Sequence, residues 1–257
     1  MKSELIVDVQ PQEIAIALTE DDRLQEINRE KRDADNFSVG NIYYGRVKKG
    51  MPALNAVFVD VGHEKDAFLH YLDLGSEFLT LRNYVTKAVS DRRKLPSMAR
   101  VQRGAPVKRE GQIADHLKIG DLLLVQVTKE PINTKGPRLT AEISIAGRNV
   151  VLIPFADKVM VSSKIKRESE RSRLKQLVSS IKPKGFGVIV RTLAEVNRVA
   201  ELDNELQLLV KRWEEAVRNL QVPKESTVPA RKSQSKDSEV RLISEEFGRT
   251  IGVIRDL

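Results

Sequence analysis

Residues 40–74 read GNIYYGRVKKGMPALNAVFVDVGHEKDAFLHYLDL, and the apolar runs of this stretch are separated by breaks that contain Gly or Pro. Two further apolar runs occur later in the chain, and each follows a Gly-containing turn. Five short strands separated by such turns are typical of a small closed barrel. The five strands expected begin at Ile42 and then cover Ala53 to Val61, Asp66 to Tyr71, Leu122 to Val127 and Arg138 to Ile145.

A long insertion, residues 75–116, separates the third expected strand from the fourth. Its start, Phe78 to Val89, is expected to be helical. A loop of this length in a compact domain is usually functional or disordered, and we expect the remainder to be flexible and basic. The basic residues of that remainder are Arg92, Arg93, Lys94, Arg100, Arg103, Lys108 and Arg109.

Alternating apolar residues before the barrel predict a β-hairpin, Leu5 to Val9 and Ile14 to Leu18, with a third strand over Leu24 to Ile27. Residues 28–37 are charged and poor in apolar side chains, which indicates a linker.

After Gly147 the pattern becomes that of mixed helices and strands. Strands are expected at Val150 to Ile153 and Gly187 to Val190, and a helix at Lys164 to Ile181. Apolar residues spaced three and four apart then predict a long helix from Val196 to Leu220.

The end of the chain has a different composition. Residues 222–239 are rich in Pro, Ser and Lys and predict a mobile linker. A helix is expected over Val240 to Phe247, followed by the strand-like Ile251 to Ile254.

The chain of 257 residues is basic, with 44 Lys and Arg against 36 Asp and Glu, a formal net charge of +8. This excess favours a polyanionic partner, either nucleic acid or an acidic membrane surface, although it is also compatible with a merely basic protein. The sequence has no cysteine, which excludes disulfides and thiolate metal sites. It has no signal peptide pattern and no run of about 20 apolar residues that would span a bilayer, so we expect a cytoplasmic protein.

Recognisable catalytic motifs are absent from the sequence. His63, His70 and His116 lack the spacing of metal ligands, and there is neither a nucleophile elbow nor a Gly-rich phosphate loop. Acidic pairs such as Asp21 and Asp22 are adjacent in the chain and usually face water. These observations favour binding over catalysis.

Two places could bind RNA. Phe58 and Phe68 lie on neighbouring expected strands, where they either stack on unpaired bases or fill the barrel interior. Lys135, in a turn, either pairs with a phosphate or is simply solvated.

The second place is Arg191 with Thr192, between a strand and the long helix. Thr192 and Glu195 have the spacing of a capping box, so the backbone N–H groups of a helix N-terminus and the Arg191 guanidinium could hold a terminal phosphate. The alternative is an ordinary helix cap beside a surface arginine.

Several segments together resemble the ribonuclease E/G family, in order and spacing, from about Leu5 to Val222. Besides residues 40–74, they are TKGPRLTAEISIAGRNVVLIP (134–154), GFGVIVRT (185–192) and LLVKRWEEA (208–216). The resemblance implies an α+β chain: a five-stranded OB-fold barrel inserted in an RNase H-like subdomain, followed by an α/β region that senses the RNA 5′ end. The implied ranges are 1–38 and 240–257 for the two parts of the RNase H-like subdomain, 39–141 for the barrel, 142–221 for the sensor and 222–239 for a flexible linker.

The resemblance also implies roles for individual residues. Phe58, Phe68 and Lys135 match the family's RNA-contacting positions. The positions that match its 5′-monophosphate pocket are Gly147, Val151, Arg191 and Thr192.

In this family two Asp residues and a magnesium ion cleave single-stranded RNA. By the resemblance, these residues and a zinc-binding Cys pair would lie beyond Leu257, so we expect no cofactor in this chain and no cleavage by it alone. The expected function is that of the RNA-binding, 5′-monophosphate-sensing half of an endoribonuclease, which in full-length form could be a homo-oligomer. The alternatives are a non-catalytic single-stranded RNA-binding module or adaptor and, less favoured, a basic ribosome-associated protein.

Overall fold

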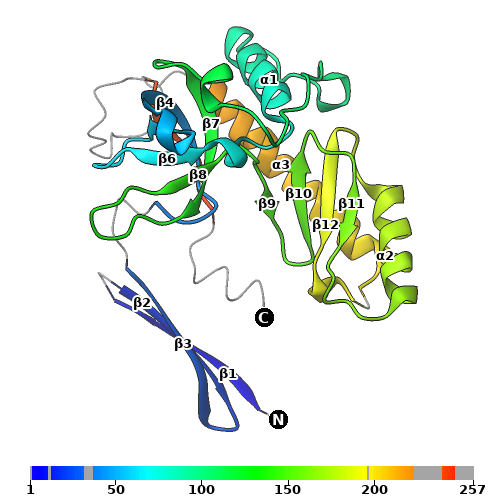
Figure 1. Cartoon of the computed structure of the whole chain (residues 1–257). Helices are drawn as coiled ribbons and strands as arrows, with labels where there is room; N and C mark the ends of the chain where they lie inside the picture. The colour runs from blue at the N-terminus through cyan, green and yellow to red at the C-terminus, as the bar shows by residue number, and fades with distance from the viewer. Residues whose placement is uncertain (1, 11–12, 32–36, 196, 223–238, 247–257) are drawn as a thin grey trace.

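The computed structural model describes residues 2–10, 13–31, 37–195, 197–222 and 239–246. Its strands form three sheets. The three α-helices in the described ranges lie around two of these, the barrel and the sheet that follows it in the chain (Figure 1). No helix in these described ranges is long and apolar enough to cross a membrane.

Five strands close into the expected OB-fold barrel. Their order is β4-β5-β6-β8-β7, and β7 pairs with β4 to complete the ring. The pair β6–β8 is parallel and the other four pairs are antiparallel. The strands are β4 (Ile42–Met51), β5 (Ala56–Asp60), β6 (Ala67–His70), β7 (Leu122–Lys129) and β8 (Arg138–Thr140).

The fifth strand is shorter than the sequence predicts. β8 ends at Thr140, whose hydroxyl donates to the carbonyl of Asp73, and the backbone N–H of Ala141 donates to the same carbonyl. The chain leaves the barrel there, and Ile145–Ala146 forms β9 in a different sheet. The single strand expected from Arg138 to Ile145 is therefore wrong.

The second sheet has the order β11-β12-β10-β9. Its members are β9, β10 (Val150–Pro154), β11 (Val159–Val161) and β12 (Phe186–Val190). β10 and β12 confirm two expected strands, whereas three-residue β11 is too short for a pattern to reveal. Helix α2 (Glu168–Ile181) contacts β11 and β12, and α3 (Val199–Gln221) contacts β9 and β10 (Figure 1).

The insertion begins with the expected helix, α1 (Phe78–Ser90). The rest of the insertion packs against the body of the protein, contrary to the expectation of a flexible loop. Ile113 and Leu117 are buried in the core, and the backbone N–H of Gly104 donates to the Thr80 hydroxyl of α1. Apolar residues interspersed among the basic ones supply this packing.

The N-terminal strands form a separate antiparallel sheet, β1 (Ser3–Val9), β2 (Glu13–Glu20) and β3 (Arg23–Lys31), which stands apart from the barrel in Figure 1. Asp21 and Asp22, at φ 47° and 61°, form the tight turn between β2 and β3. β3 continues to Lys31, so the linker expected over residues 28–37 is wrong for residues 28–31.

The helix expected over Val240 to Phe247 is wrong. Residues Arg241–Ser244 form β13, which pairs antiparallel with β4. Val240 and Ile243 are buried, and the Arg241 guanidinium donates to the Leu220 carbonyl. Ile42–Tyr44 lie beyond the part of β4 that pairs with β5, so this side of the strand can pair with β13, and that pairing outweighs a weak local helix preference. The expected strand at 251–254 and the expected linker at 223–238 lie outside the described residues.

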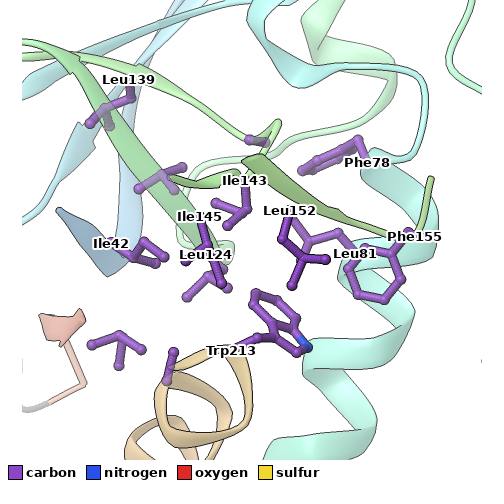
Figure 2. Close-up of a cluster of buried hydrophobic side chains, with 14 of the residues drawn as sticks. Ile42, Phe78, Leu81, Leu124, Leu139, Ile143, Ile145, Leu152, Phe155 and Trp213 are labelled. Atoms are coloured by element: carbon purple, nitrogen blue, oxygen red, sulfur yellow. The ribbon is translucent and has the colours of Figure 1, made fainter. Parts of the chain in front are cut away.

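One hydrophobic core runs from the barrel into the second sheet, and Trp213 of α3 lies at its centre (Figure 2). The Trp213 ring is fully buried, 6.0 Å from the ring of Tyr84 on α1 and 5.8 Å from that of Phe155, which follows β10. The Tyr84 hydroxyl donates to the Pro96 carbonyl, and burial raises the pKa of Tyr84 to about 12. These rings join α1, α3 and the second sheet.

Replacing Trp213 with Ala should lower the free energy of unfolding by about 3–5 kcal/mol, because the change leaves a large cavity between three elements. Urea denaturation followed by circular dichroism measures this, since Trp213 is the only tryptophan. Leu208→Ala, on the exposed side of the same helix, is the control and should cost less than about 0.5 kcal/mol. Equal losses in the two variants would contradict this account of the core.

Candidate nucleic-acid interface

Phe58 and Phe68 lie on the outer face of the barrel. They are opposite each other on β5 and β6, with ring centroids 5.9 Å apart and planes inclined by 69°. Val57, Val59 and Leu69, their neighbours in sequence, point into the barrel and are at most 3% exposed. Side chains alternate between the two faces of a strand, so both phenylalanines are half-buried on the surface. The structure thus excludes the alternative in which they fill the interior.

His70 extends this aromatic surface, and the sequence analysis did not include it. Its ring stacks beside that of Phe68, with centroids 6.5 Å apart. Its Nδ1 accepts a hydrogen bond from the backbone N–H of Leu72, so the neutral ring carries its proton on Nε2. The signal that could have identified it is its spacing, two residues after Phe68 on one strand, which places both on the same face.

Basic residues flank the two phenylalanines in one row across the barrel. Lys49 of β4 is opposite Phe58, Arg138 of β8 is opposite Phe68, and Lys129 of β7 is opposite Arg138. The row places aromatic rings between positive charges, an arrangement suited to a strand of stacked bases with a phosphate backbone.

Lys135 is exposed in a tight turn between β7 and β8, in which Ile132 and Lys135 exchange backbone hydrogen bonds. The turn lies close to the start of β6. A Cβ on Gly136 would lie only 2.3 Å from the carbonyl oxygen of Asp66, so the close approach requires glycine at this position. The turn therefore lies beside the strand that carries Phe68. Arg138 is less available than Lys135, since its guanidinium donates to the Asp73 carboxylate at 2.8 and 3.1 Å.

The second predicted site lies at one end of the second sheet. Gly147 follows β9, Val151 lies on β10 and Arg191 follows β12. The Arg191 guanidinium donates to the Gly147 carbonyl at 2.7 Å, and the Arg191 backbone N–H donates to the carbonyl of Asn149. The structure therefore brings together residues that are 44 positions apart in the chain.

The capping box expected at Thr192 and Glu195 is wrong. Thr192–Ala194 is a short 3-10 helix, and α3 begins only at Val199, where the Glu201 carboxylate accepts from the backbone N–H of Arg198. The Thr192 side chain is exposed and makes no hydrogen bond to any other residue in the described ranges. α3 begins seven residues after Thr192. The backbone N–H groups at the N-terminus of this helix therefore do not lie at Thr192, where the sequence predicted that they would bind a terminal phosphate.

Glu205 of α3 fixes the loop of this site, and local sequence gave no indication of it. Its carboxylate accepts from the backbone N–H of Asn149 at 3.0 Å and from the Asn149 side-chain amide at 2.9 Å. A Cβ on Gly147 would lie 2.1 Å from a Glu205 carboxylate oxygen and 2.8 Å from the Val150 carbonyl oxygen, so only glycine fits there. The loop 147–149 is thus held between α3 and Arg191.

Magnesium, which the resemblance implies for the family, finds no ligand set in the described ranges. Among those residues no three His, Asp or Glu side chains are grouped so that they could hold a metal ion.

Comparison with known proteins shows to which family the chain is related. Residues 144–257 match the model of the ribonuclease E/G family. The chain is 38% identical to ribonuclease G of Escherichia coli K12 over 213 residues, 83% of this chain and 40% of that protein. It is 34% identical to ribonuclease E of Nostoc sp. PCC 7120 over 220 residues, 85% of this chain and 28% of that protein. The chain thus spans less than half the length of these relatives, and it belongs to the ribonuclease E/G family.

Proposed function

We propose that this chain binds single-stranded RNA on the barrel and senses a 5′ monophosphate at Arg191, within an endoribonuclease that acts in RNA processing and decay. The observation that carries the proposal is the pair Phe58 and Phe68, half-buried side by side on the outer face of an OB-fold barrel and flanked by lysine and arginine. Such a surface stacks bases without regard to their identity. Relatives named ribonuclease G and ribonuclease E support RNA as the ligand.

The proposed phosphate pocket rests on the chemistry of Arg191. Its guanidinium donates to the Gly147 carbonyl, and a phosphate dianion would be a stronger acceptor than this neutral oxygen. The exposed Thr192 hydroxyl follows directly in the chain, and in this proposal the loop of Gly147 and the β10 residue Val151 would form the other side of the pocket. A 5′ hydroxyl has no negative charge, so it would not replace the Gly147 carbonyl as the acceptor for the Arg191 guanidinium.

The domain organisation belongs to the same proposal. Residues 39–141 would be the RNA-binding barrel and residues 142–221 the 5′ sensor. Residues 1–38 and 240–257 would be parts of one RNase H-like subdomain, joined to the sensor by the linker 222–239. The absence of cysteine suits a reducing cytoplasm, where we place the protein.

Phe58→Ala and Phe68→Ala should each weaken binding of a ten-nucleotide RNA with a 5′ hydroxyl by about 1–3 kcal/mol, the usual loss for one stacked base. Fluorescence anisotropy measures this, and the 5′ hydroxyl isolates the barrel from the phosphate pocket. Met160→Ala, an apolar truncation at the partly exposed edge strand of the second sheet, should leave affinity unchanged. Wild-type affinity in both folded Phe variants would show that the barrel does not stack bases.

Arg191→Ala should abolish the preference for a 5′ monophosphate over a 5′ hydroxyl and leave affinity for the hydroxyl form unchanged. A hydrogen bond to a charged group contributes about 1.5–3 kcal/mol, so the preference lost should be roughly tenfold or more. Titrating matched RNAs that differ only at the 5′ end measures it. Lys184→Ala, which removes one charge just before the other end of β12, is the control. The sensing role is refuted by equal affinities of the wild-type chain for the two RNAs.

Glu205→Ala should also reduce the 5′-monophosphate preference, because it releases the loop 147–149. Glu205→Gln keeps an oxygen that accepts from Asn149 and removes a negative charge near the phosphate, so it should preserve or increase the preference. The same paired titrations measure both variants, and thermal denaturation reports their stability. If Glu205→Ala lowers stability but retains the wild-type preference, Glu205 has only a structural role.

A further inference from the structure

The basic part of the insertion lines a hollow that neither proposed RNA site includes. The hollow, of about 670 Å³, lies where the C-terminal ends of α1 and α3 meet. Four of its seven lining residues are cations and none is acidic. They are Arg92, Arg93, Lys94, Leu95, Arg218, Gln221 and Val222.

A second hollow, of about 1020 Å³, continues from the first along α1, and the two share Lys94 and Leu95. Its lining adds the cations Arg82, Lys87 and Arg100, and Asp91 is its only acidic residue. The Asp91 carboxylate accepts a hydrogen bond from the backbone N–H of Arg93. We call these two hollows together the basic groove.

The turn that carries the cations is held in one conformation by a buried side chain. The Gln221 amide nitrogen donates to the carbonyls of Ala88, Asp91 and Lys94, at 2.9 to 3.1 Å. Gln221 is only 8% exposed. Because these hydrogen bonds come from the chain itself, little backbone ordering would oppose binding at the turn.

The four cations of the smaller hollow differ from several arginines elsewhere in the described ranges, because they have no carboxylate partner there. Arginines that do pair with carboxylates include Arg29, Arg46, Arg103, Arg138, Arg171, Arg173 and Arg212. In the described ranges, by contrast, no carboxylate pairs with the side chains of the four cations in the smaller hollow.

The effect of these charges reaches the neighbouring Arg241. Burial lowers the pKa of Arg241, and the positive charge of Arg92 acts in the same direction. Such repulsion costs stability in the absence of a ligand, and a bound polyanion would offset it.

We propose that the basic groove binds the phosphate backbone of RNA, as a contact separate from the barrel and from the 5′ pocket. Many of the residues that line the groove are lysine or arginine, and few are aromatic. The groove would therefore bind the phosphates of the RNA backbone and would not distinguish between bases. An acidic protein segment would satisfy the same charges. RNA is favoured because the inference rests on the proposed RNA-binding function of the same chain.

A purely structural explanation also exists, since cations near helix C-termini stabilise the helix dipole. The two explanations differ in their consequences for stability. If the cations serve the ends of α1 and α3, their removal lowers the melting temperature. If they serve RNA, their removal relieves repulsion and leaves the melting temperature equal or higher.

The test is R92Q/R93Q in the 257-residue chain, measured with a 30-nucleotide single-stranded RNA over a range of salt concentrations. Each phosphate contact to a single strand contributes about 0.7 to the slope of log affinity against log salt, so the slope should become shallower by about 1.4. Affinity should fall about 25-fold at 0.1 M salt. Arg218→Gln, on α3, should reduce the slope by about 0.7.

R23Q/K175Q is the matched control, since it removes two exposed charges from β3 and α2. It should change slope and affinity far less. The ratio of affinities for 5′-monophosphate and 5′-hydroxyl RNA should stay at the wild-type value in R92Q/R93Q, so failure of the groove is distinguishable from failure of the 5′ pocket.

Three outcomes would overturn the proposal. The first is an R92Q/R93Q slope equal to that of the control. The second is a lowered melting temperature with unchanged RNA affinity, which assigns the cations to the helix ends. The third is a polyglutamate peptide that binds the wild-type chain as tightly as RNA of equal charge and loses affinity in R92Q/R93Q, which assigns the groove to an acidic protein.

Discussion

Burial of Trp213 is the interaction on which the arrangement of this protein depends. The barrel and the second sheet are consecutive in the chain, but α1 interrupts the first and α3 follows the second. Packing of Tyr84 and Phe155 against Trp213 fixes both helices and the second sheet in one apolar core (Figure 2). This shared core, and not hydrogen bonding between strands, fixes the position of the barrel relative to the second sheet.

Helix α3 also supports two surface segments through hydrogen bonds of its side chains. Glu205 near its start holds the loop beside Arg191, and Gln221 at its end holds the turn of the basic groove. At 1.5 Å per residue these side chains are about 24 Å apart along the helix axis. Since one rigid element carries both supports, the proposed 5′ pocket and the proposed backbone groove lie at a fixed separation. A single RNA could then contact both without rearrangement of the protein.

The spacing of apolar residues correctly predicted the helices and strands in which this spacing is regular. The barrel strands and α1 follow from alternation and helical spacing, and the outward position of Phe58 and Phe68 follows once the register of β5 and β6 is known. The errors arose where long-range pairing outweighed local preference. Residues 241–244 have no strong strand pattern, but the exposed edge of β4 makes them a strand. Thr192 has the chemistry of a helix cap, but α3 begins seven residues later.

The sequence by itself determined the barrel, the basic charge and the identity of the residues with RNA-binding chemistry, because these depend on residue type and on short-range periodicity. Only the tertiary structure decided how those residues are used. It excluded the interior position of Phe58, added His70 beside it and brought Arg191 to Gly147. It also turned a basic loop into a groove supported by Gln221. Each of these results comes from contacts between residues far apart in the chain, for which no local pattern carries information.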